Sequence, residues 1–209
     1  MNGRIHLFWL IVAVVVAALA IFACFYAGLF GSIYNRPEGD PTDTVTQFFE
    51  SIRLGNYPLA YSCLSDYTTL GLENEPETPE AKAVYDAMKQ SYSWSLDGSC
   101  SVSGTEATQK VNLRVLNIRR TEAAVTARVD SVLQEMIADM PSAQVYDETG
   151  AYRSSLTDAV YTEALRQALQ DMDPLCETTS LELHLQYMDG SWKIITDRTL
   201  MNALVGGQS

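Results

Sequence analysis

Few side chains in this sequence combine the type and the spacing that acid–base or nucleophilic chemistry requires. The chain holds two histidines, His6 and His184. His6 flanks an apolar segment, and His184 alternates with Leu183 and Leu185, which places it on the polar face of a predicted strand. Asp66 follows a short predicted helix, where a carboxylate is ordinary. We therefore predict a solvated His184 and no acid–base pair that moves protons in an active site.

Four arginines are grouped around one predicted turn. Arg114 and Arg128 are expected on the polar sides of two neighbouring strands, with Arg119 and Arg120 between them. Such a group is able to bind an anion. The chain also carries 26 acidic residues, so surface ion pairs of small energetic consequence are the preferred interpretation.

Three cysteines follow the apolar N-terminal segment: Cys63, Cys100 and Cys176. In an oxidising compartment one pair would be able to form a disulfide, leaving the third thiol free. Their spacing matches no zinc motif, and only His184 is available to complete a ligand set. The sequence also lacks a Gly-rich phosphate loop, a G-x-S-x-G motif, a calcium loop and a Cys-x-x-Cys pair. We predict no catalytic, cofactor-binding or metal-binding residues, and no cofactor.

The net charge of the chain limits the classes of partner that it is expected to bind. The formal net charge is −12, and every acidic residue and every basic residue except Arg4 lies after position 35. A surface of this sign repels phosphate backbones and anionic headgroups, so nucleic acid is excluded as an expected partner. We interpret the acidic residues as a solvated surface.

The N-terminal segment has the composition of a membrane span. From Leu7 to Ile33 the chain contains no charged residue. About 20 apolar residues cross a bilayer, whereas the apolar part of a signal peptide has only about 7–15. Arg4 precedes the segment, and Glu38 and Asp40 follow it. This asymmetry predicts a single-pass protein of a bacterial cell membrane, with a cytoplasmic N-terminus and an extracytoplasmic C-terminal domain.

Lipid attachment is the alternative for the same segment. Residues 21–24, "IFAC", resemble a bacterial lipobox, whose cysteine, here Cys24, is acylated after cleavage. Phe22 fits that motif poorly, and the sequence after Cys24 stays apolar. We therefore divide the chain into a cytoplasmic stub and uncleaved anchor at 1–34, a linker at 35–41 and one extracytoplasmic domain at 42–209.

Apolar periodicity predicts a helix at the start of the domain. This helix is capped by Thr42 or Asp43 and ends at Gly55. It carries Phe48 and Phe49 on its buried stripe. Filling the core is therefore the expected role of both rings.

The rest of the domain alternates between helical and strand periodicity. A second helix is expected from Pro58, and a third from Pro79, with Thr78 as its cap. Asp189 and Gly190 form a strong hairpin signal. The expected strands are 94–102, 111–115, 123–129, 181–187 and 191–197, and further helices are expected at 133–140, 160–172 and 198–206.

Two stretches of the sequence resemble a known superfamily. They are "PTDTVTQFFESIRLGNYPLAYSCLSD" (41–66) and "DGSWKIITDRTLMNALVGG" (189–207). They are similar to parts of nuclear transport factor two-like domains, in which helices pack on a curved antiparallel sheet to form a cone-shaped half-barrel. The resemblance spans about residues 42–206 and includes membrane-anchored and lipoprotein domains of Gram-positive bacteria. A helical insertion at about 131–173 departs from the compact members.

The resemblance implies an α+β fold with a pocket, but its motifs are structural. Enzymes of the superfamily place proton-moving side chains inside the cone. We expect Tyr61, Tyr85 and Trp94 at the pocket rim, because each carries a polar atom on an apolar ring.

The leading hypothesis for function is a non-catalytic, membrane-tethered module. It would bind a protein, a peptide or a small envelope ligand, and a weak homodimer is compatible with it. The alternatives are an isomerase or dehydratase that uses the same cone, and a structural subunit of a membrane complex. The fold alone does not decide among them.

Overall fold

The structure, a computed structural model, describes residues 37–66 and 71–206 of the 209-residue chain. These residues form an α+β fold in which helices accompany one open, four-stranded antiparallel sheet. The predicted anchor at 1–34, and with it Cys24, lies outside the described residues. Within the described part, no helix has the length and apolar character needed to cross a membrane.

The strands of the sheet are neighbours in sequence order. They are β1 (Ser93–Ser103), β2 (Glu106–Leu116), β3 (Cys176–Met188) and β4 (Ser191–Ile194). The longest ladder joins β2 and β3, from Glu106 opposite Gln186 to Leu116 opposite Cys176. β4 pairs with the end of β3, and its last residue, Ile194, also forms a parallel bridge with Leu64 after α3. The strands predicted at 94–102, 111–115, 181–187 and 191–197 are therefore present, although β4 ends at residue 194.

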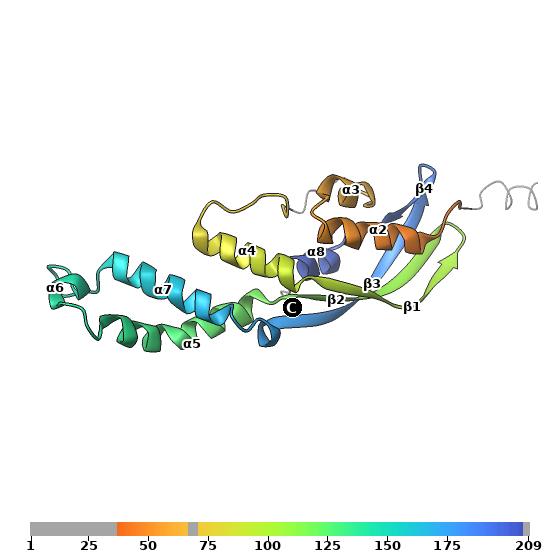
Figure 1. Cartoon of the computed structure of the whole chain (residues 1–209). Coiled ribbons are helices and arrows are strands. Elements are labelled where there is room, and N and C mark those ends of the chain that lie inside the picture. Colours follow the sequence, from red (N-terminus) through yellow and green to blue (C-terminus); the bar gives the residue numbers. More distant parts are fainter. Residues whose placement is uncertain (1–36, 67–70, 207–209) are drawn as a thin grey trace, which may run out of the picture.

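Four helices cover one face of this sheet (Figure 1). They are α2 (Pro41–Arg53), α3 (Tyr57–Ser62), α4 (Pro79–Ser91) and α8 (Arg198–Leu204). Helix α2 begins earlier than predicted, because Asp40, and not Thr42 or Asp43, is its cap. The Asp40 side chain accepts a hydrogen bond from the Thr42 backbone N–H at 2.8 Å. Pro41 then occupies the first helical position, where its missing N–H costs nothing. Thr78 caps α4 as predicted.

The main core lies between these helices and the inner face of the sheet. It contains Phe48 and Phe49 of α2 and Trp192 of β4, all buried. The Phe48 and Phe49 rings meet edge to face, with centroids 5.0 Å apart. Further fully buried side chains of this core are Leu113, Leu185, Ile194 and Leu200. The expected core role of the two phenylalanines is confirmed.

A helical excursion separates β2 from β3. It consists of α5 (Ile118–Ile137), α6 (Ser142–Val145), α7 (Ser154–Ala168) and a short 3-10 helix, η1 (Asp173–Leu175). Figure 1 shows α5 and α7 side by side in a hairpin that projects away from the sheet, with α6 at its tip. The excursion begins at residue 118, earlier than the insertion expected at about 131–173.

The strand predicted at 123–129 is wrong, because these residues belong to α5. The alternation that suggested a strand also contains Val125, Val129 and Val132 at helical spacing. All three belong to the apolar cluster that joins α5 to α7. Asn117 defines the start of the helix, since its side chain accepts a backbone N–H at 3.0 Å. Packing against α7 therefore decides the helical conformation.

Candidate functional site

The side chains first considered for chemistry do not meet. His184 is exposed on β3, and Asp66 is exposed after α3. Arg114 forms an ion pair with Asp173 at 2.5 Å. Arg128 lies on α5 and donates to a backbone carbonyl one turn earlier. The two arginines do not lie on neighbouring strands, so that part of the sequence interpretation is wrong.

Cys63, Cys100 and Cys176 are free thiols. The disulfide considered from the sequence is therefore absent among these three residues. Burial raises the pKa of the Cys63 thiol, so this side chain stays protonated and packs as a small apolar group. Within the described ranges, no group of three or more His, Cys, Asp and Glu side chains is arranged to hold a metal ion.

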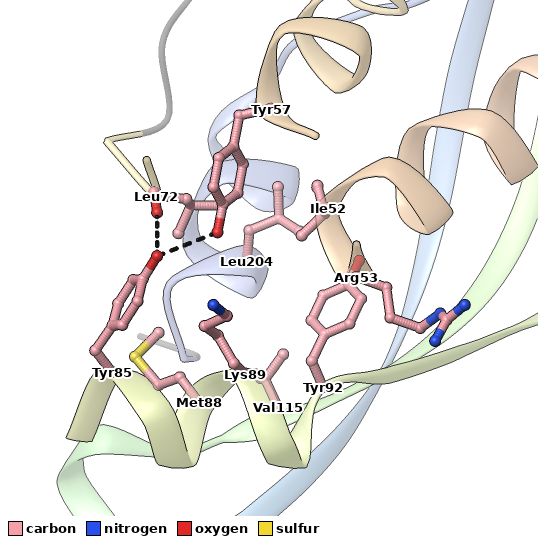
Figure 2. A pocket seen from close by; sticks show the side chains of 10 residues that line it. All are labelled: Ile52, Arg53, Tyr57, Leu72, Tyr85, Met88, Lys89, Tyr92, Val115 and Leu204. Atoms are coloured by element: carbon pink, nitrogen blue, oxygen red, sulfur yellow. Dashed lines mark hydrogen bonds between the residues drawn. The ribbon is translucent and has the colours of Figure 1, made fainter. Parts of the chain in front are cut away.

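A small pocket lies among α2, α3, α4, α8 and β2 (Figure 2). Its volume is about 50 Å³, which is room for roughly three to five water molecules. The apolar part of its lining comes from five segments of the chain. These side chains are Ile52, Leu72, Met88, Val115 and Leu204.

Three tyrosines add hydroxyl groups to the lining: Tyr57, Tyr85 and Tyr92. The Tyr85 hydroxyl donates to the Leu72 carbonyl at 3.0 Å and lies 3.3 Å from the Tyr57 hydroxyl. Because Tyr85 has a single hydroxyl hydrogen, Tyr57 is the donor between the two rings. Burial, and after it the bond to Tyr85, raises the pKa of Tyr57, and burial raises the pKa of Tyr92. Both phenols are therefore neutral at physiological pH.

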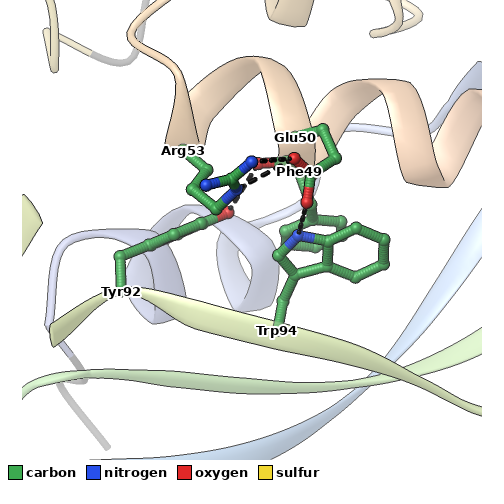
Figure 3. A network of polar contacts seen from close by, with 5 residues as sticks. All are labelled: Phe49, Glu50, Arg53, Tyr92 and Trp94. Atoms are coloured by element: carbon green, nitrogen blue, oxygen red, sulfur yellow. Dashed lines mark hydrogen bonds and ion pairs between the residues drawn. The ribbon is translucent and has the colours of Figure 1, made fainter. Parts of the chain in front are cut away.

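Glu50 organises one side of the pocket (Figure 3). Its carboxylate accepts from Arg53 Nε at 2.9 Å, lies 2.7 Å from Arg53 Nη2 and accepts from Trp94 Nε1 at 3.1 Å. Arg53 lowers the pKa of Glu50. The Tyr92 hydroxyl donates to the Phe49 carbonyl at 3.5 Å. Figure 2 shows the Arg53 guanidinium directed away from the pocket. The aliphatic part of Arg53 therefore forms part of the pocket wall, and its positive charge is paired with Glu50.

Lys89 carries the other positive charge of the lining. Its Nζ lies 5.3 Å from the centroid of the Tyr85 ring, within the range of a cation–π contact. Figure 2 shows the ammonium directed into the ring of lining side chains. Across the described ranges, it forms no hydrogen bond or ion pair. The pocket thus combines apolar walls, neutral phenols and an exposed cation, groups that are able to contact a hydrogen-bond acceptor or an anion.

The three predicted rim residues are only partly brought together. Tyr85 lines the pocket. Tyr61 is 3% exposed, stacks on Tyr57 with centroids 6.4 Å apart and donates to Glu73. Trp94 stacks on Phe49 with centroids 5.4 Å apart, so it supports the Glu50 side of the site and does not line it.

Several lining residues were missed from the sequence, among them Met88, Lys89 and Tyr92. Together with the predicted Tyr85 they recur at spacings of three or four, along one side of α4 and its end. That spacing is a signal that was available. Leu204 lies far from α4 in the chain, and no local pattern connects it to the pocket.

The comparisons with known proteins give one weak structural likeness. No family model and no curated protein matches the chain. The crystal structure of a candidate lipoprotein, ycdA, from Bacillus subtilis is similar with a TM-score of 0.35 and 13% sequence identity. The match covers 80% of this chain and 48% of that chain. This chain therefore spans about half the length of the protein that it matches.

Replacing Tyr85 with phenylalanine is expected to lower the free energy of unfolding by about 1 kcal/mol, because the Leu72 carbonyl and the Tyr57 hydroxyl lose their partner. Urea unfolding followed by far-ultraviolet circular dichroism measures the change. Tyr161→Phe is the matched control, since Tyr161 lies on α7 and is 48% exposed. Equal midpoints for the two variants would show that the Tyr85 hydroxyl does not hold the Leu72 segment.

Proposed function

We propose that this protein is a non-catalytic binding module tethered at the outer face of a bacterial cell membrane. The observation that carries the proposal is the pocket bounded by α2, α3, α4, α8 and β2. Apolar walls with a few convergent polar groups are the usual composition of a binding site. The ligand is a protein, a peptide or a small envelope molecule. In this proposal the helices and the sheet together form a cone-like half-barrel.

The size of the pocket limits what it receives. Sites for drug-sized ligands have volumes of about 300–1,000 Å³, whereas this pocket has about 50 Å³. It therefore accepts one apolar side chain of a larger partner, or a molecule with a short apolar end. The neutral phenols of Tyr57 and Tyr92 favour hydrogen bonding over general-base catalysis.

The proposed location rests on the sequence of the N-terminal segment. The uncharged run from Leu7 to Ile33 is long enough to span a bilayer. Figure 1 places the start of α2 and the tip of the α5–α7 hairpin at opposite ends of the described structure. A membrane anchor joined before α2 would therefore direct the hairpin away from the membrane.

A structural subunit of a membrane complex is the second candidate, and two observations favour it. The space between α2 and the sheet is filled by buried side chains, Phe48, Phe49 and Trp192 among them. The projecting hairpin also exposes aromatic rings. Tyr146 and Tyr152 stack with centroids 5.3 Å apart, and each is about 40% exposed. Exposed aromatic side chains are enriched at protein interfaces.

Xenon binding tests the leading proposal. In the full chain, held in phosphatidylcholine nanodiscs, xenon is expected to shift the methyl resonances of Val115 and Leu204, which line the pocket. Met88→Trp fills the pocket and should abolish these shifts. Met136→Trp places the same ring on α5 and should leave them unchanged. Shifts that persist in Met88→Trp, or that never occur in the parent, would remove the pocket as the basis of function.

A further inference from the structure

We infer that the pocket binds a small organic anion. Its short apolar chain lies against the apolar lining residues, and its carboxylate-like head lies at Lys89. This inference rests on the proposed binding function and names its ligand class. It comes from three features of the lining: the hydrogen-bond donors that remain unused, the engagement of the neighbouring carboxylates, and the volume next to the ammonium.

The donors of the pocket tyrosines are already used within the protein. Tyr85 donates to the Leu72 carbonyl, which leaves Tyr57 to donate to Tyr85. Tyr92 donates to the Phe49 carbonyl. A ligand that accepts hydrogen bonds must therefore accept them from a positively charged side chain. Lys89 has three N–H groups and no hydrogen-bonded partner anywhere in the described structure.

The carboxylates around the pocket are matched to other groups. Glu50 pairs with Arg53, and Glu75 pairs with Lys82. Glu73 accepts the hydrogen bond of Tyr61. Lys89 acts on Glu75 only as a minor influence on its pKa, which is lowered chiefly by Lys82. Among the described residues Lys89 therefore forms no ion pair within 4.0 Å, although Asp86 lies one turn earlier on the same helix.

The position of this charge gives the ligand its second property. Figure 2 shows the ammonium of Lys89 directed among the lining side chains, beside Met88 and below Leu204. Each ligand methylene that is buried against the apolar lining strengthens binding by about 0.8 kcal/mol, which is about fourfold in affinity. A volume of about 50 Å³ accommodates only a few carbons. The anion is therefore expected to carry a short chain of roughly two carbons inside the pocket, since a cavity of about 150 Å³ holds the six carbons of benzene.

A matched series of acids and alcohols tests the inference on the full chain in phosphatidylcholine nanodiscs. The probes are the straight-chain carboxylates from acetate to heptanoate and the primary alcohols of the same lengths. Methyl resonances of Met88 and Leu204 report binding. We expect affinity for the carboxylates to rise about fourfold per methylene and then level off when the pocket is full. Each alcohol of equal length should bind about tenfold more weakly, because it lacks the charge that meets Lys89.

Three variants assign the preference to Lys89. Lys89→Gln should bring carboxylate affinity down to that of the alcohols, and Lys89→Arg should retain the preference. Lys110→Gln is the control, because Lys110 lies on β2 and faces Glu182 at 3.8 Å. Equal binding of acids and alcohols to the parent protein would overturn the preference for an anion while leaving the binding function in place. If the parent protein binds neither series, both proposals are wrong. A carboxylate preference that survives Lys89→Gln would overturn the role of Lys89.

Discussion

Replacing Trp192 with alanine is expected to unfold most of the α+β domain. The indole is 4% exposed, meets Tyr187 edge to face with centroids 5.5 Å apart, and donates from Nε1 to the Gly39 carbonyl at 3.2 Å. The Trp192 carbonyl accepts from the Thr44 hydroxyl at 3.4 Å. Truncation of such a buried ring costs about 3–5 kcal/mol, out of a total stability of roughly 5–15 kcal/mol.

The measurement for Trp192 is urea unfolding of the full chain in detergent, followed by far-ultraviolet circular dichroism. His184→Ala is the control within the same sheet, because His184 is exposed on the neighbouring strand. Its stability should change by less than about 0.5 kcal/mol. A Trp192→Ala protein that unfolds at the parent midpoint would show that the indole is not part of the core. Trp192 would then have to be treated as a recognition residue.

Replacing Phe49 with alanine is expected to cause a loss of similar size, about 3–5 kcal/mol. The side chain has no exposed surface, and it lies between the edge of Phe48 and the stacked face of Trp94. Its removal leaves a cavity at the centre of the contact between α2 and the sheet. The indole of Trp94, which donates to Glu50 at 3.1 Å, also loses its stacking partner.

The Phe49 prediction is checked by the same unfolding experiment and by near-ultraviolet circular dichroism, which reports the packing of Trp94. Leu54→Ala is the matched control, because Leu54 directly follows α2 and is 70% exposed. Its unfolding midpoint should stay with that of the parent. If Phe49→Ala and Leu54→Ala lose stability equally, the apolar stripe of α2 does not form the centre of the core.

Much of the helix and strand pattern could be predicted from the sequence because its signals are local. Thr78 and Pro79 start α4 through one cap and one fixed φ angle. Asp189 and Gly190 adopt φ of 52° and 80°, the positive values that a tight hairpin turn requires. Phe48 and Phe49 lie on the buried stripe that helical spacing indicates.

The helical excursion shows where local signals fail. Residues 123–129 satisfy a strand pattern and a helix pattern at the same time, since Val125 and Val129 fit both. Burial against α7 is available only to the helix. The competing pattern is therefore rejected by contacts with residues about 35 positions further along the chain, which no local window contains.

The pocket lining also contains one part that local sequence signals predict and another part that only the tertiary structure brings together. The sequence by itself determined that Tyr85, Met88 and Lys89 share one side of a helix, because their spacing follows the helical repeat. Only the tertiary structure decided that Leu204 closes the space beside them and that the neighbouring carboxylates are engaged elsewhere. The physical reason is that a cavity is what remains after distant segments have packed. Its lining depends on how the whole core packs. Many contacts contribute to that packing, so no single residue of the sequence predicts the lining.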